Sequence, residues 1–129
     1  MKITAIDHIV LTVKNIAETV KFYESVLGME TELFADGRKA LKFGTQKINL
    51  HQHGQEFEPK AHAPLPGSED LCFITETALD SAMEHVQQCG ITVIEGPVQR
   101  TGATTTLLSF YFRDPDGNLI EVANSTSKA

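Results

Sequence analysis

The chain has 129 residues, of which 41% are hydrophobic and 22% charged, and its formal net charge is -6. This length fits one compact domain or two small modules, and the negative charge argues against nucleic acid and anionic membranes as partners. No apolar run reaches the ~18 residues of a membrane span, and the N-terminus has no signal-peptide core. The two cysteines, Cys72 and Cys89, have no metal-binding spacing. Free thiols are typical of a reducing compartment, so we expect a cytoplasmic protein.

The first half of the chain predicts one strand, one helix and three further strands. The alternating, β-branched run 6–13 is typical of a strand. Asn15 is expected to cap a helix that Gly28 ends. Short strands are expected at 29–34, 38–43 and 46–53, with a turn at Asp36 and Gly37. Residues 54–68 hold three of the five prolines, which predicts a linker or an ordered surface loop.

The second half repeats this order. A strand is expected at 70–75, a helix from 77 to Gly90, and strands at 91–95, 106–112 and 118–123, with a turn at 114–117. Residues 125–129 are expected to form a frayed tail. The sequence therefore predicts an α+β fold of two βαβββ modules, about residues 4–56 and 69–124, joined by a linker at 57–68.

The internal repeat places four potential metal ligands at two pairs of related positions. The shift that superimposes the two helix-ending glycines also places His8 on Asp70. Further along, KINLH, which ends at His51, aligns with GNLIE, which ends at Glu121. Because side chains alternate between the faces of a strand, all four should lie on the face opposite the helices. A curled sheet would turn that face into a pocket for a cation.

The runs IDHIVLTVKNIAETVKFYESVLGM and FRDPDGNLIEV resemble the vicinal-oxygen-chelate superfamily, which includes glyoxalase I, bleomycin- and fosfomycin-resistance proteins and extradiol dioxygenases. The resemblance covers about residues 4–124. The chain is most similar to small glyoxalase-domain proteins, one described as virulence-associated, through FGTQKINLH, PGSEDLCFI and EGPVQRTGA. The resemblance implies curved half-barrel modules, a small-molecule substrate, and a metal held in a cleft, often between the two chains of a homodimer.

Carried over by position, the resemblance implies metal ligands at His8, His51, Asp70 and Glu121, with Glu121 also the catalytic base. Relatives usually have histidine at the position of Asp70, which could instead cap a turn. His53 shares the face of His51 and is an alternative to it. Imidazole and carboxylate without thiolate suit Ni, Co, Mn, Fe or Zn.

Two further residues are candidates for substrate contact. Arg100 is either a solvated loop charge or an anion clamp, and Tyr111 belongs to the core or to a pocket wall. We favour a metal-dependent lyase or isomerase of glyoxalase type that acts on a small oxygenated metabolite. The alternatives are an extradiol-type dioxygenase, with iron on His8, His51 and Glu121, and a binding or resistance protein without catalysis.

Overall fold

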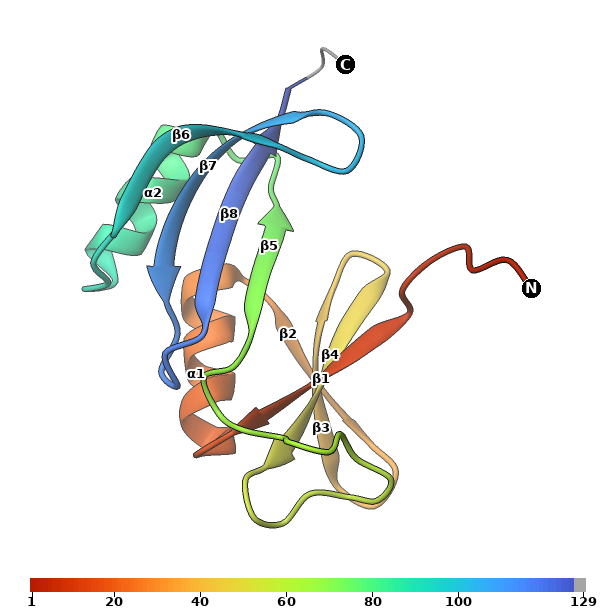
Figure 1. Cartoon of the computed structure of the whole chain (residues 1–129). Coiled ribbons are helices and arrows are strands. Elements are labelled where there is room, and N and C mark those ends of the chain that lie inside the picture. The colour runs from red at the N-terminus through yellow and green to blue at the C-terminus, as the bar shows by residue number, and fades with distance from the viewer. Residues whose placement is uncertain (127–129) are drawn as a thin grey trace. The chain divides into compact units, whose positions relative to one another are not determined.

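The computed structural model describes residues 1–126, which fall into two compact units, Met1–Gly67 and the residues from Ser68 onward. Each unit contains a strand, a helix and three more strands, and the four strands form one sheet. The strand order is β1-β4-β3-β2 in the first sheet and β5-β8-β7-β6 in the second (Figure 1). The predicted α+β fold of two βαβββ repeats is confirmed. No helix among residues 1–126 is long and apolar enough to cross a membrane.

The first unit follows the predicted elements closely. Its elements are β1 (His8–Val13), α1 (Ile16–Leu27), β2 (Glu30–Phe34), β3 (Arg38–Phe43) and β4 (Gln46–Gln52). Helix α1 begins after Asn15, whose side chain accepts a hydrogen bond from the Glu18 amide at 2.9 Å. It ends at Gly28, which has a φ of 68°, a left-handed conformation that glycine adopts without strain.

The second unit repeats this order with β5 (Asp70–Ile74), α2 (Leu79–Gln88), β6 (Glu95–Thr101), β7 (Thr106–Arg113) and β8 (Leu119–Ser125). The strand expected at 91–95 is wrong, because β6 begins at Glu95 and pairs with β7 across a register shift before Val98. Gly96 and Pro97 lie inside β6, and these two residue types are typical of loops, so the sequence predicts a loop there. Ser125 pairs with Leu107 and so belongs to β8, not to a frayed tail. Residues 127–129 of that expected tail lie outside the described part of the chain.

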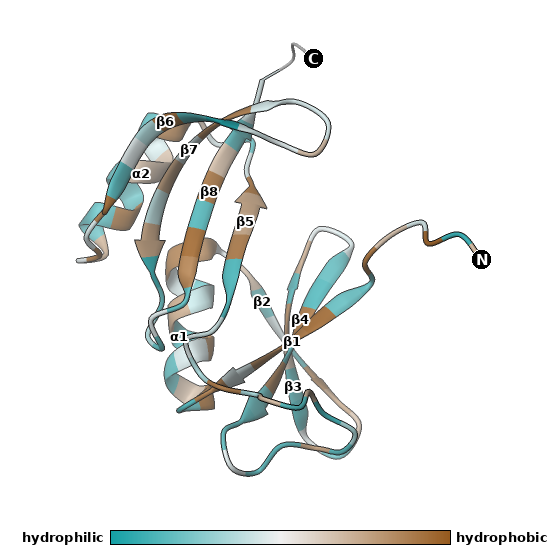
Figure 2. Ribbon diagram, viewed as in Figure 1, coloured by the Kyte–Doolittle hydropathy of each residue, from teal (hydrophilic) through white to brown (hydrophobic). Residues whose placement is uncertain are grey.

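Alternation along the strands separates an apolar face from a mixed face. Leu11 and Val13 of β1, Leu50 of β4, and Ile120 and Val122 of β8 are at most 5% exposed and form the core. Figure 2 shows this alternation along β8 as successive hydrophobic and hydrophilic bands. The alternate residues of these strands, which include His8 and Glu121, point to the opposite face of their sheets. We call this the outer face of each sheet.

A buried hydrogen-bond network closes the turn between β7 and β8. The Asp114 carboxylate accepts hydrogen bonds from the amides of Asp116 and Asn118, both at 2.9 Å, and from the Asn118 side chain at 2.8 Å. The side-chain oxygen of Asn118 accepts from the Glu69 amide at 2.9 Å. The turn is thereby tied to the residue that precedes β5. The DPDGN sequence thus fixes where β5 and β8, the neighbouring strands that carry Asp70 and Glu121, begin.

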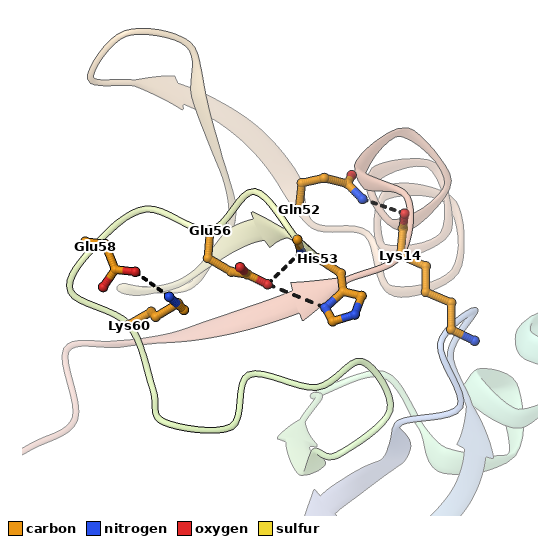
Figure 3. A network of polar contacts seen from close by, with 7 residues as sticks. Lys14, Gln52, His53, Glu56, Glu58 and Lys60 are labelled. Atoms are coloured by element: carbon orange, nitrogen blue, oxygen red, sulfur yellow. Dashed lines mark hydrogen bonds and ion pairs between the residues drawn. The ribbon is translucent and has the colours of Figure 1, made fainter.

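The segment after β4 forms an ordered loop, part of which is drawn in Figure 3. The Glu56 carboxylate accepts a hydrogen bond from the Gly54 amide at 2.8 Å and lies 3.5 Å from Nδ1 of His53. Gln52 donates to the carbonyl oxygen of Lys14 at 2.6 Å, which joins the end of β4 to the end of β1 (Figure 3). Of the two sequence interpretations of this segment, the contacts support an ordered loop.

Candidate functional site

Glu121 lies at the centre of a polar cluster on the outer face of the second sheet. The strand register places it opposite Cys72 on β5 and opposite Tyr111 on β7. Its carboxylate lies close enough to the thiol and the phenol to raise the pKa of both groups. Glu121 is only partly exposed. A carboxylate in this position lies beside two potential hydrogen-bond donors and remains partly accessible.

The two partners of Glu121 hold their protons at neutral pH. Cys72 is exposed as a residue, yet loss of hydration around its thiol raises its pKa to about 11, and the charge of Glu121 adds to the rise. The pKa of Tyr111 is also raised, first by burial and then by Glu121, although Arg100 opposes the shift. Both groups therefore remain donors toward the carboxylate.

Arg100 positions Tyr111. Its Nε donates to the phenol oxygen at 2.9 Å, its Nη2 donates to Glu95 at 3.1 Å, and its Nη1 donates to the carbonyl oxygen of Gln99 at 3.1 Å. Every nitrogen of this guanidinium is engaged, and Glu95 balances its charge. Because Tyr111 accepts a hydrogen bond from Arg100, its own proton is free to point at Glu121. Arg100 and Tyr111, the two separate candidates for substrate contact, thus lie side by side, and Arg100 is paired internally.

Asp70 and Glu121 share the outer face of the second sheet. Asp70 pairs with Leu119, and Glu121 is two residues further along β8, so the two carboxylates stand in a diagonal relation. Asp70 is exposed at the start of β5. The structure brings these two predicted ligands together on one surface.

His8 and His51 also share an outer face, but they are not neighbours. His8 pairs with Lys47, which is four residues before His51 on β4. The two histidines are therefore about 13 Å apart along the strand direction. His8 is exposed, and its Nδ1 lies 2.9 Å from the Asp7 carboxylate, which leaves Nε2 as the nitrogen for a ligand. Within the first unit the structure does not bring these two histidines to one point.

His51 is engaged by Arg38. His51 is 3% exposed, and its Nε2 lies 3.3 Å from Nη2 of Arg38. A guanidinium can only donate, so Nε2 accepts the hydrogen bond, and its lone pair is occupied. Burial and then the charge of Arg38 lower the pKa of His51, against a smaller opposing effect of Glu56. His53, the alternative ligand, has a half-exposed side chain at the end of β4 next to Glu56.

The register identifies a residue that the sequence comparison missed. Asn49 lies opposite Val10 in the β1–β4 pair, as Glu121 lies opposite Cys72 in the β5–β8 pair. The repeat equivalent of Glu121 is therefore Asn49, and the alignment of His51 with Glu121 was wrong by two residues. Asn49 is 7% exposed, and its side-chain oxygen has no hydrogen-bond partner among residues 1–126.

A family model for the glyoxalase/bleomycin resistance protein/dioxygenase superfamily matches residues 5–122. The chain belongs to this superfamily. The match spans both βαβββ repeats, so each unit described above corresponds to one module of a glyoxalase-type fold.

Similar members of the superfamily cover most of the chain. This chain is 58% identical to the virulence protein STM3117 of Salmonella typhimurium, over 95% of this chain and 85% of that protein. It is 52% identical to the glyoxalase domain-containing protein RDO1 of Mycosarcoma maydis, over 96% of this chain and 70% of that one. The solved integron cassette protein VCH_CASS1 from the mobile metagenome of V. cholerae has 61% identity and a TM-score of 0.96, covering 98% of both chains.

More distant superfamily members include metalloenzymes. The metallothiol transferase FosB of Shouchella clausii is 28% identical over 96% of this chain and 82% of its own. The fosfomycin resistance protein FosX of Listeria monocytogenes, solved with Mn(II), has 20% identity and a TM-score of 0.68, covering 98% of this chain and 94% of its own, and shows the shared fold.

Neither unit alone gathers a complete metal site. Among residues 1–126, no three histidine, cysteine, aspartate or glutamate side chains come close enough to hold one ion. Each unit instead presents two oxygen or nitrogen donors at equivalent outer-face positions. These are His8 and Asn49 in the first unit, and Asp70 and Glu121 in the second.

Proposed function

We propose that this superfamily member is a metal-dependent lyase or isomerase that acts on a small oxygenated metabolite. The observation that carries the proposal is the Glu121 cluster, in which a partly exposed carboxylate lies beside two protonated neighbours, Cys72 and Tyr111, on the outer face. The relation to metal-dependent members such as FosB and FosX supports the metal requirement.

The donors available fit a borderline divalent ion. The free Nε2 of His8 and the carboxylates of Asp70 and Glu121 supply one imidazole and two oxygens, a set that suits Mn, Fe, Co, Ni or Zn. Asn49 is the fourth donor we favour, because its buried oxygen has no partner. His51 fits less well, because its Nε2 is occupied by Arg38.

We further propose that the protein forms a symmetric homodimer, which would give two equivalent metal sites for each dimer.

Glu121 is the proposed catalytic base. A bound ion would polarise a substrate carbonyl and hold a neighbouring oxygen, which acidifies the adjacent C–H bond. Glu121 takes that proton, since a carboxylate on the open face is within reach of a bound substrate. Tyr111, fixed by Arg100, keeps its own proton and donates a hydrogen bond beside the base.

The proposal is tested by metal content and by proton exchange. Protein dialysed against Mn or Zn should retain about one ion per chain, and it should catalyse metal-dependent deuterium incorporation into α-hydroxycarbonyl compounds in D₂O. Glu121→Gln should lose exchange, and His8→Ala should lose the metal. His62→Ala, in the exposed loop, is the matched control and should change neither. Retention of metal by both His8→Ala and Glu121→Ala would overturn the ligand assignment.

A further inference from the structure

Arg38 lies over two aromatic rings on the outer face of the first sheet. Its guanidinium carbon lies 5.2 Å from the ring centre of Phe34 and 4.4 Å from that of Phe57. Phe34 is its cross-strand partner on β2, and Phe57 comes from the loop after β4. Nη2 of Arg38 donates to His51 at one end. These contacts fix the guanidinium plane, which removes much of the rotamer entropy that an arginine loses on binding.

The charge of Arg38 has no counterion among residues 1–126. Its polar partner is the neutral ring of His51, whereas Arg100 on the second sheet is balanced by Glu95. Nε of Arg38 is buried and has no hydrogen-bond partner within the described part of the chain. The acidic residues that share this face, Glu30 and Glu32 on β2, form no ion pair with Arg38. Glu56, a loop carboxylate that acts electrostatically on His51, instead contacts the Gly54 amide and His53.

A second cation lies against the same aromatic ring. The ammonium nitrogen of Lys47, on β4, is 4.1 Å from the ring centre of Phe34. Arg38 and Lys47 thus flank one phenyl ring, and neither has a carboxylate partner in the described part of the chain. Two partly buried cations beside one apolar wall leave a positive potential that an external anion can neutralise.

We propose that Arg38 and Lys47 form a binding subsite for the oxyanion group of a small-molecule ligand, with Phe34 and Phe57 as its apolar walls. Nη1 makes no hydrogen bond among the described residues, so the Nη1 and Nη2 end of the guanidinium presents a fork to a carboxylate or phosphate. His51 serves this subsite by orienting Nη2. This inference rests on the proposed function in one respect, since it assigns an anionic group to the metabolite.

The first experiment is an NMR titration of metal-free protein with inorganic phosphate and, separately, with malonate at constant ionic strength. Saturable shifts are expected at the Arg38 side-chain N–H and at the backbone amides around Lys47 and His51. Arg38→Gln should weaken binding by about tenfold or more, because it removes a charge-assisted hydrogen bond. Arg113→Gln is the matched control, since Arg113 is exposed and donates to the Gly117 carbonyl oxygen.

Each outcome decides the proposal. Saturation by one probe supports the subsite and assigns phosphate or carboxylate chemistry to it. Only linear shifts with either probe, or equal affinity in Arg38→Gln and the parent, would overturn it. If Arg38→Gln folds poorly, Lys47→Gln, at a partly exposed position, is the second variant. It should weaken anion binding by about threefold.

Metal uptake separates this proposal from the proposed function. Arg38→Gln should retain the parent's metal affinity while it loses anion binding. His8→Ala should lose metal while it keeps saturable anion binding to the metal-free protein. Loss of both properties in Arg38→Gln, with an unchanged unfolding temperature, would mean that the oxyanion subsite and the metal site are not distinct.

Discussion

Asn49 and Glu121 occupy the same position in their two sheets. Each is the second outer-face residue of a last strand that runs parallel to the first strand of its repeat, opposite Val10 and Cys72 respectively. The repeat thus offers a neutral amide oxygen in one unit and a carboxylate in the other. The difference predicts that Glu121 supplies the charge and the base, while Asn49 contributes at most a neutral ligand.

The first prediction concerns which residue completes the metal site. Asn49→Ala should weaken Mn or Zn binding by about tenfold, and Asn49→Asp should strengthen it, because a carboxylate binds a divalent cation better than an amide. His51→Gln should leave affinity nearly unchanged, since Nε2 of His51 already accepts from Arg38. Competition with a chelating dye measures all three. Loss of metal in His51→Gln but not in Asn49→Ala would restore His51 as the ligand.

The fold could be predicted from the sequence because its signals are local. Asn15 and Gly28 bound α1 as expected, and alternating Leu11 and Val13 identify the core face of β1. The strand after α2 was misplaced because Gly96 and Pro97, inside β6, are typical loop residues. Only the pairing with β7 shows that they belong to a strand.

The candidate site could be predicted only in part, because strand register is not a local property. Aligning His51 or Asn49 with Glu121 gives the same alternation of apolar residues, since the two differ by two positions on one face. The hydrophobic pattern therefore cannot choose between them. The aromatic contacts of Arg38 were also missed, because Phe34 and Phe57 reach it from different segments.

The second prediction tests the DPDGN turn as a structural element. Asp114→Ala should lower the free energy of unfolding by about 2–4 kcal/mol, because it leaves the amides and side chain of buried Asn118 without their acceptor. Urea unfolding followed by circular dichroism measures the loss. Glu84→Ala, at an exposed position of α2, is the control and should stay within about 0.5 kcal/mol of the parent. A similar small effect at Asp114 would contradict the network's importance.

The third prediction concerns the close approach of β6 to β7. A Cβ on Gly96 would lie 2.6 Å from the Cα of Phe110, and the residue's φ is 122°. Gly96→Ala should therefore cost about 4 kcal/mol or more, or prevent folding, because a central strand's backbone cannot move aside. Gly44→Ala is the control: its φ of 53° is left-handed but its surroundings are open, so a cost of about 1 kcal/mol is expected. Thermal unfolding of both variants measures the two losses of stability. Equal losses in Gly96→Ala and Gly44→Ala would exclude the steric explanation.

The last prediction uses Cys72 as a reporter of the Glu121 carboxylate. A pKa of about 11, raised from 9.0 by lost hydration and then by Glu121, means that little thiolate exists at pH 8. Because the thiolate is the nucleophile, iodoacetamide should modify Cys72 about 100-fold more slowly than an unperturbed thiol. The measurement is made by mass spectrometry on metal-free Cys89→Ser protein, in which Cys72 is the remaining thiol. Glu121→Gln should accelerate the reaction, since removal of the negative charge lowers the thiol pKa, and Glu84→Gln should not. An unchanged rate in Glu121→Gln would mean that the carboxylate does not face the thiol, and the proposed base would then lose its position.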